Sequence, residues 1–409
     1  MRISTSEFIA LMAMLVATVA LSIDGMLPAL PYIASELSPE NPNRAQLVLS
    51  SFVVGMALGT FLMGPLSDSF GRKTIIYWGA GLYVFFAVIC MLATNLETLT
   101  LARIMQGIGA AGPRVVSQAL VRDLYSGREM ARITSFIMII FALVPAVAPL
   151  LGAAVMLMFQ WQAIFAVFIL FVILSTTWMG VRIQEPVTLE KRRPFDFISL
   201  KTAIIEILSH RMVRTAIVTL IFAYSVLFTG LLLIQPVFDI YFARADIFPV
   251  WFAVIAILAA SASFVNAILV LQWGMRRLVS IAFRVQVFWS AVMLLLLNNG
   301  TLSGEFGFAM FVLWMLGVFF QAGMTMGNLT ALAMEPLGHI AGTAASLVSA
   351  LATLGSVILA GIVGQFFDGT PLVMFVGVVV FAICGVISTN HLQRFKRPSQ
   401  SASQTETKI

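Results

Sequence analysis

Long apolar runs recur along the whole sequence, and they constrain the fold more than any other feature. About 20 apolar residues are enough for a helix to cross a bilayer, and about twelve runs approach or exceed that length. They lie at 8–32, 46–66, 74–94, 98–120, 131–157, 161–183, 212–238, 248–272, 278–298, 306–332, 341–366 and 370–392. Only 10% of the 409 residues are charged, whereas a soluble domain carries about a quarter. The sequence therefore predicts an all-α integral membrane protein.

The longest polar segment, roughly residues 184–211, divides the runs into two sets of six. We therefore expect an N-terminal half at 1–183, a cytosolic linker at 184–211 and a C-terminal half at 212–392. The tail at 393–409 is polar and lacks apolar periodicity, which is typical of a disordered segment.

The positions of Lys and Arg predict how the chain crosses the membrane, because cytosolic loops are enriched in these residues. If the N-terminus is cytosolic, only Arg44 and Arg244 lie in outer loops, and Arg103, Arg114 and Arg284 lie within spans. All other Lys and Arg residues then face the cytosol, so we expect both termini there.

Several classes of function are not expected from this sequence. It contains no phosphate-cradling loop, no His/Cys cluster with metal-ligand spacing and no nucleophile–base pair at a common depth. We therefore expect no enzyme, cofactor or metal. Cys90 and Cys384 lie in apolar runs, so a disulfide is not expected. The net charge of +6 forms no basic stripe with exposed aromatics, so nucleic acid is not an expected partner.

The first apolar run contains a single acid, Asp24. This run is longer than the apolar core of a signal peptide, so we expect it to remain as a span. An ionised Asp at the bilayer centre costs about 2.5–3.5 kcal/mol on insertion scales. Such a residue finds a partner, faces a hydrated cavity or holds a proton, and it marks a transport pathway more often than a structural accident.

The fourth span, which contains LARIMQGIGAAGPRVVSQ, has one polar face. At 100° per residue this face carries Arg103, Gln106, Gly107, Ala110 and Arg114. Two cations with small residues between them should line a cavity rather than contact lipid.

Arg103 and Asp24 lie at comparable depths, about 8 and 12 Å below the outer surface at 1.5 Å per residue. An Arg at that depth stabilises the Asp24 carboxylate, whereas desolvation favours the neutral acid. These opposing effects would let the carboxyl exchange a proton as hydration changes, so we assign proton coupling to Asp24 and Arg103. The alternative is a permanent ion pair that holds the first and fourth spans together.

The segment GPLSDSFGRK follows the second span and predicts a tight turn that Gly64 and Gly71 permit. Asp68 can lie near a helix N-terminus or pair with Arg72, which would fix one arrangement of a cytosolic gate. The alternative is an ordinary charged loop.

Two further groups of residues are assigned to the gate. Arg122 and Asp123, which leave the fourth span, would latch the cytosolic side together with the Asp68–Arg72 loop. The fifth span contains LVPAVAPLLGAA, in which Pro145 and Pro149 are four residues apart on one face. This spacing predicts a bend, and small residues such as Gly152 let helices approach closely.

Polar side chains are few within the second half, and some lie at helical spacing on one face. Such a face either lines a cavity or bonds neighbouring helices, and both interpretations are open. The candidate substrate-binding residues of the two halves are Met26, Gln106, Tyr224, Phe228, Gln235, Asn266, Gln321, Thr325 and Asn328. One titratable carboxylate among many Phe and Met residues favours neutral or monocationic lipophilic molecules over sugars.

GPLSDSFGRK resembles the loop signature G-x-x-x-D-x-x-G-R-K/R of the major facilitator superfamily. SIDGMLPALP, ALVRDLYSGREMARITSF and HIAGTAASLVSAL are similar to the Bcr/CflA-like branch of drug–proton antiporters, and RIMQG matches the motif arginine at Arg103. The similarity covers almost the whole chain. The fifth span departs from the antiporter signature, because Ala148 precedes Pro149 and Ala153 follows Gly152 where the signature has glycines.

This resemblance implies the major facilitator fold, with two six-helix lobes that alternate access around a central cavity. It implies a proton-coupled antiporter that exports small amphipathic, drug-like molecules and confers antibiotic resistance, with protons as the coupling ion and no cofactor. We expect a monomer among the lipids of the bacterial cytoplasmic (inner) membrane. The alternatives are a proton-coupled importer or exporter of one specific metabolite, and a non-transporting membrane receptor or scaffold.

Overall fold

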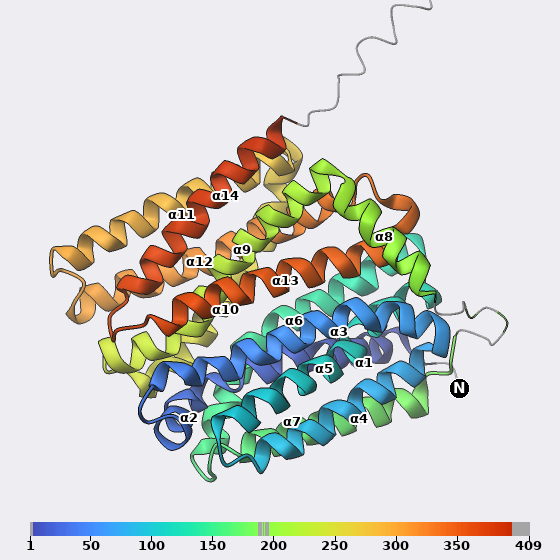
Figure 1. Ribbon diagram of the computed structural model, residues 1–409, viewed down its shortest axis with the longest axis horizontal. Helices are drawn as coiled ribbons and strands as arrows, with labels where there is room; N and C mark the ends of the chain where they lie inside the picture. Colours follow the sequence, from blue (N-terminus) through green and yellow to red (C-terminus); the bar gives the residue numbers. More distant parts are fainter. Residues whose placement is uncertain (1–2, 187–189, 191, 193–195, 395–409) are drawn as a thin grey trace, which may run out of the picture.

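The computed structural model describes residues 3–186, 190, 192 and 196–394, and its regular structure is helical (Figure 1). The predicted tail beyond residue 394 and linker residues 187–189, 191 and 193–195 lie outside the described residues. The helices before the linker are α1 Thr5–Asp24, α2 Leu30–Leu37, α3 Leu47–Phe70, α4 Arg72–Met91, α5 Leu96–Leu124, α6 Gly127–Met156 and α7 Ala163–Arg182. Those from the linker onward are α8 Phe197–Ser209, α9 Arg211–Pro236, α10 Phe248–Trp273, α11 Met275–Asn298, α12 Gly304–Met334, α13 Ala341–Gln365 and α14 Leu372–Gln393.

The helical segments agree with the predicted spans. Among the described residues, 11 segments are long and apolar enough to cross a membrane, and the first of them joins α1 to α2. α5, with 29 residues, is also long enough to cross a membrane, but it is not among these 11 segments because it carries more charge than they do. Its charged residues include Arg103, Arg114, Arg122 and Asp123. With α5 counted, each predicted span corresponds to one helical segment of the structure.

The first span is not the single helix predicted over 8–32, because it is interrupted after Asp24. α1 ends at that residue, and the Gly25 amide bonds to the Leu21 carbonyl at 3.0 Å. A 3₁₀ turn at Leu27–Ala29 and then α2 follow, each with a proline in its first turn. Proline has no amide hydrogen to donate to the preceding turn, so the chain restarts twice. Asp24 therefore lies at a break in the span.

The helices form two groups that lie side by side (Figure 1). In the first group α5 packs against α3 and α4, while α1 packs against α5, α6 and α7. In the second group α9 packs against α12, α13 and α14, and α11 packs against α12 and α14. Between the groups, α3 contacts α13 and α6 contacts α10. The two lobes predicted at 1–183 and 212–392 correspond to these two groups, and their exact boundaries stay a prediction.

Glycines bring α5 close to both of its neighbours. A Cβ atom on Gly107 would lie 2.1 Å from the Phe52 carbonyl oxygen of α3, and one on Gly109 would lie 2.5 Å from the Tyr83 amide nitrogen of α4. Real Cβ atoms do not approach other atoms so closely, so these positions require glycine. The tight packing of α3, α4 and α5 fixes the polar side chains described below.

The linker region contains a short helix that the sequence analysis did not place. α8 begins after Asp196, whose Oδ1 accepts a hydrogen bond from the Ile198 amide at 2.8 Å, as a helix N-cap does. α8 contacts α9 and α13, and it lies at the same end of the molecule as the N-terminus, with α2 at the opposite end (Figure 1). Cys90 and Cys384 are both free.

Candidate functional site

Asp24 lies at the end of α1 with 5% of its surface exposed. Within the described residues, no hydrogen bond or ion pair reaches its carboxyl group. Its carboxyl oxygens are not fully enclosed. They therefore still reach a small accessible space. A buried carboxyl without a cation favours its neutral, protonated form because an isolated buried charge is costly.

Arg103 lies on α5 and is fully buried, with 0% exposure. Its Nε donates to the Val48 carbonyl at 3.0 Å, and its Nη2 donates to the Ser22 carbonyl at 2.9 Å. Nη1 donates to Oε1 of Gln106 at 2.7 Å. The guanidinium carbon also lies 4.2 Å from the centre of the Phe52 ring. These contacts hold a buried cation between α1, α3 and α5 without a carboxylate.

The structure therefore lacks the permanent Asp24–Arg103 ion pair that was one of the two predicted arrangements. Arg103 instead binds the carbonyl of Ser22, two residues before Asp24 on α1. The guanidinium is satisfied by neutral oxygens, so it can stay in place whether or not Asp24 carries a proton. Its assignment to proton coupling remains a proposal.

A chain of buried hydroxyl and amide groups surrounds Arg103, and most of it was not predicted from the sequence. The Ser22 hydroxyl lies 2.6 Å from the Tyr83 hydroxyl and donates to the Thr18 carbonyl at 2.6 Å. Gln106 is buried, and its Nε2 has no partner in the described structure. Serine and tyrosine in apolar spans are common, so only the polar face of the fourth span indicated this region.

α6 packs directly against the break that follows Asp24. A Cβ atom on Gly152 would lie 2.1 Å from the Gly25 carbonyl oxygen, so the close approach predicted for Gly152 is present. Pro145 and Pro149 both lie inside α6, which continues through them from residue 127 to 156. The helix that carries both prolines thus touches the chain next to the buried acid.

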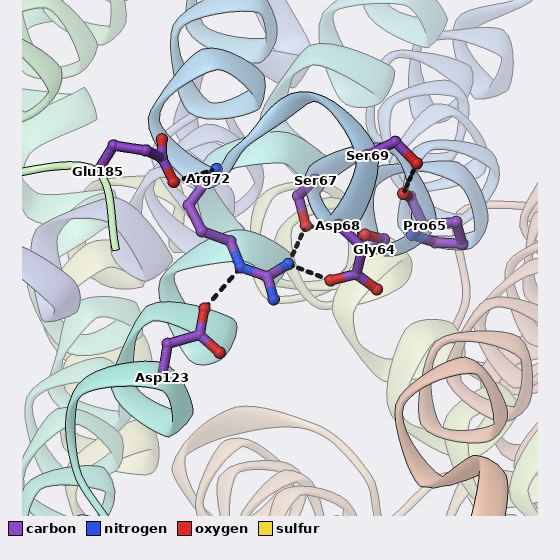
Figure 2. Close-up of polar contacts among 8 residues, drawn as sticks. All are labelled: Gly64, Pro65, Ser67, Asp68, Ser69, Arg72, Asp123 and Glu185. Carbon is purple, nitrogen blue, oxygen red and sulfur yellow. Dashed lines mark hydrogen bonds and ion pairs between the residues drawn. The ribbon is translucent and has the colours of Figure 1, made fainter. Parts of the chain in front are cut away.

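The segment after the second span forms a charged network around Arg72, the first residue of α4 (Figure 2). Arg72 Nη1 contacts Asp68 Oδ1 at 2.5 Å, and its Nε contacts Asp123 Oδ2 at 2.7 Å. Nη1 also donates to the Ser67 hydroxyl at 2.6 Å, and the backbone amide donates to Glu185 Oε1 at 2.9 Å. One guanidinium therefore joins α3, α4 and α5, and the amide beside it binds the segment that follows α7.

Three details of the gate prediction need correction. Gly64 is not in a turn, because α3 continues through it to Phe70, and only Gly71, with φ of +98°, makes the turn. Arg122 is exposed and takes no part in the Arg72 network within the described residues, whereas its neighbour Asp123 does. Glu185 was not predicted, since a single acid in a polar linker gives no signal of its partner.

The predicted substrate residues do not form one cluster. Met26 is fully buried in the apolar core, so it lines no accessible surface in this structure. Tyr224 stacks on Phe228, with 6.2 Å between ring centres. Arg114 of α5 lies near enough to Tyr224 of α9 for its charge to act on the tyrosine hydroxyl. This pair brings polar groups of the two helix groups together.

The remaining candidates lie within the second group of helices. Asn328 of α12 donates to Asn266 of α10 at 2.6 Å, which supports interhelical hydrogen bonding for that pair. Thr325 donates to the Gln321 carbonyl at 2.8 Å. Gln321 lines an apolar groove made only by α10, α11 and α12, so it does not join the residues around Arg103. Gln235 is buried near the end of α9.

Two contacts connect the helix groups near opposite ends. Asn43, just before α3, donates to the Phe367 carbonyl at 2.7 Å and to the Gln365 carbonyl at 3.2 Å, at the end of α13. At the other end of α3, a Cβ atom on Gly64 would lie 3.3 Å from the Ser346 hydroxyl of α13. α3 and α13 thus run together along their length. Within the described residues no group of three or more His, Cys, Asp or Glu side chains could hold a metal ion.

Comparisons with known proteins agree with this architecture. The model of the Major Facilitator Superfamily matches residues 11–360. The chain is 30% identical over 381 residues to the uncharacterized MFS-type transporter YdgK of Bacillus subtilis, covering 90% of this chain and 92% of that protein. It is also 30% identical over 385 residues to the bicyclomycin resistance protein homolog of Haemophilus influenzae, covering 92% of this chain and 94% of that protein.

A solved structure shows the same fold. The crystal structure of a D-xylose–proton symporter superposes with a TM-score of 0.73 at 15% sequence identity, over 96% of this chain and 98% of that one. The predicted resemblance to the Bcr/CflA-like branch is confirmed by the bicyclomycin resistance relative. The chain therefore belongs to the major facilitator superfamily, and it is a multi-pass membrane transporter rather than an enzyme.

Proposed function

We propose that this transporter is a proton-coupled antiporter that exports small amphipathic, drug-like molecules. The observation that carries the proposal is the isolated, buried carboxyl of Asp24 at the break in the first span. A carboxyl in this position holds a proton while it is enclosed and releases it when water reaches it. The bicyclomycin resistance relative supports a drug-like substrate.

Arg103 keeps a fixed positive charge near Asp24 in this scheme. Because Arg103 bonds to the carbonyls of Val48 and Ser22, it does not have to move when Asp24 loses its proton. Its charge would favour the carboxylate once water reaches Asp24, and Asp24 would then cycle between both forms. The cycle needs no cofactor other than the proton.

Access alternates in this scheme by movement of the two helix groups against each other. The contacts of α3 with α13 and of α6 with α10 are the surfaces along which they separate. Gly152, which packs on Gly25, would transmit movement of α6 to the backbone beside Asp24. The Arg72 network would hold the cytosolic ends of α3, α4 and α5 as one unit. A difference of a few kcal/mol in binding free energy between the inward-open and outward-open states suffices for such a cycle.

The substrate would bind where Tyr224 and Phe228 of α9 approach Arg114 of α5. Stacked rings beside a cation suit an aromatic, amphipathic molecule with hydrogen-bond acceptors. We place the protein as a monomer in the bacterial inner membrane with both termini in the cytosol, in accordance with the distribution of Lys and Arg.

The substitution Asp24→Asn tests the proposal, because Asn resembles a permanently protonated Asp. We expect the variant to insert and fold normally but to lose efflux driven by a pH gradient in proteoliposomes. Counterflow exchange of substrate without a gradient should persist, since it needs no proton release. Efflux equal to that of the wild type would remove Asp24 from the mechanism.

A further inference from the structure

The turn between α10 and α11 carries a concentration of positive charge that the transport cycle does not use. An open pocket of about 840 Å³ at this turn is lined by Arg276, Arg277 and Arg284, with Glu335 as its one acidic residue. Arg277 and Arg284 are exposed. Three cations against one carboxylate leave this pocket with an excess of positive charge.

The corresponding turn of the first half shows how such a charge is neutralised. Gly71 and Gly274 both have left-handed φ angles, +98° and +75°, with ψ of 151° and 153°, and basic residues follow each of them. In the first half, Asp68, Asp123 and Glu185 surround the turn. Among the described residues, the second turn has the same backbone but fewer acids around it, so an external anion can supply negative charge.

A buried hydroxyl at the base of this pocket also lacks a partner. Ser280 lines the pocket and is 2% exposed, and its Oγ makes no hydrogen bond within the described structure. An unpaired buried hydroxyl is unfavourable, because it has lost its hydrogen bonds to water. A ligand that displaced the side chains over this enclosed hydroxyl would give it an acceptor.

An apolar groove continues from the same pocket along the helices. It is formed by α10, α11 and α12, has a volume of about 490 Å³, and shares Trp273 and Ile281 with the basic pocket. Trp273 is 42% exposed, and neighbouring residues such as Leu271 and Phe288 are exposed as well. A charged pocket that leads into a groove on the lipid-facing side matches the two parts of a phospholipid.

We propose that this surface binds an anionic phospholipid. The phosphate would lie between Arg277 and Arg284, and an acyl chain would occupy the groove beside Trp273. Basic pockets between transmembrane helices at the cytosolic side are suited to anionic headgroups. The site is separate from Asp24, so lipid binding does not depend on the proposed transport function.

Quenching of tryptophan fluorescence tests the proposal with the full-length protein in lipid nanodiscs. The probes are phosphatidylglycerol and phosphatidylcholine with brominated acyl chains, compared at equal mole fraction. We expect stronger quenching by brominated phosphatidylglycerol, and Trp273→Phe should remove much of the difference. The double variant Arg277→Gln/Arg284→Gln should reduce the preference by about tenfold or more, because each arginine near an anionic lipid contributes roughly fivefold.

The matched control is Arg128→Gln/Arg132→Gln, which removes two exposed arginines from α6. This control should keep the preference of the wild type. Equal quenching by both lipids in the wild type, or an unchanged preference in the α11 double variant, would overturn the proposal. Full displacement of the lipid by soluble glycerol phosphate would also overturn it, because the acyl groove would then contribute nothing.

Discussion

At the residue scale, the hydrogen-bond partners of Arg103 explain how the first helix group holds a buried positive charge. A buried guanidinium is usually expected beside a carboxylate, yet here it is bound by two backbone carbonyls and one amide oxygen. Backbone carbonyls do not titrate, so the position of Arg103 does not depend on pH. This separates the fixed cation from the acid that is proposed to exchange the proton.

The substitution Arg103→Lys tests whether geometry or charge matters at this position. Lys keeps the charge but is a point donor that cannot span both carbonyls. We expect the variant to lose about 2–3 kcal/mol of stability, because at least one buried acceptor loses its partner. Its thermal unfolding midpoint in detergent should fall, and gradient-driven transport should fall with it.

The control for this experiment is Arg132→Lys, since Arg132 is exposed on α6. It should match the wild type in both measurements. If Arg103→Lys also matched the wild type, the bonds to Val48 and Ser22 would not be needed.

The Arg72 network provides a second residue-scale prediction, with adjacent residues as test and control. Asp123→Asn removes the charge that contacts Arg72 at 2.7 Å. A hydrogen bond between charged groups contributes about 1.5–3 kcal/mol, so we expect transport to fall by about tenfold at unchanged expression. Arg122→Gln changes the neighbouring residue, which is outside the network, and should leave transport unchanged. Equal effects of the two substitutions would indicate a general charge effect.

At the element scale, the packing of α3 against α5 depends on glycine. Gly107→Val would place a branched side chain where even a Cβ atom lies 2.1 Å from the Phe52 carbonyl. Overpacking of this kind costs about 1–3 kcal/mol, so the thermal unfolding midpoint should fall. Gly81→Val is the control, because a Cβ atom there has nothing within 4 Å. A similar midpoint for both variants would contradict this account of the packing.

The sequence predicts elements better than it predicts their partners. The apolar runs identified the spans because a bilayer imposes a minimum length. The helices that carry Asp24 and Arg103, α1 and α5, pack against each other. The break after Asp24 was missed, although Pro28 and Pro31 indicate it. The carbonyl partners of Arg103 could not be predicted, because every residue has a carbonyl and only the fold selects Val48 and Ser22.

At the scale of the whole molecule, the two helix groups are connected where α3 meets α13. Asn43 is hydrogen-bonded to Gln365 and Phe367 near one end, and Gly64 approaches Ser346 towards the other. A transporter that alternates access must break one of these contacts while it keeps the other. The contact of Gly64 with Ser346 is suited to a direct test, because a Cβ atom on Gly64 would lie 3.3 Å from the Ser346 hydroxyl.

The test is a disulfide between the two helix groups, Gly64→Cys/Ser346→Cys, in a background with Cys90→Ser and Cys384→Ser. Bonded cysteines have Cβ atoms about 3.5–4.5 Å apart, which this contact can satisfy. We expect the disulfide to form on mild oxidation and to stop gradient-driven transport. Reduction should restore transport, because only the movement of α3 away from α13 has been blocked.

The control disulfide lies inside one helix group, so it should not affect movement between the groups. Thr219 of α9 and Ser388 of α14 have hydroxyl oxygens 2.6 Å apart, and Thr219→Cys/Ser388→Cys is expected to cross-link without stopping transport. If the Gly64–Ser346 disulfide formed completely and transport continued, α3 and α13 would not separate during the cycle. The two groups would then have to separate along the contact of α6 with α10 alone, with the closed contact of α3 with α13 as the fixed axis.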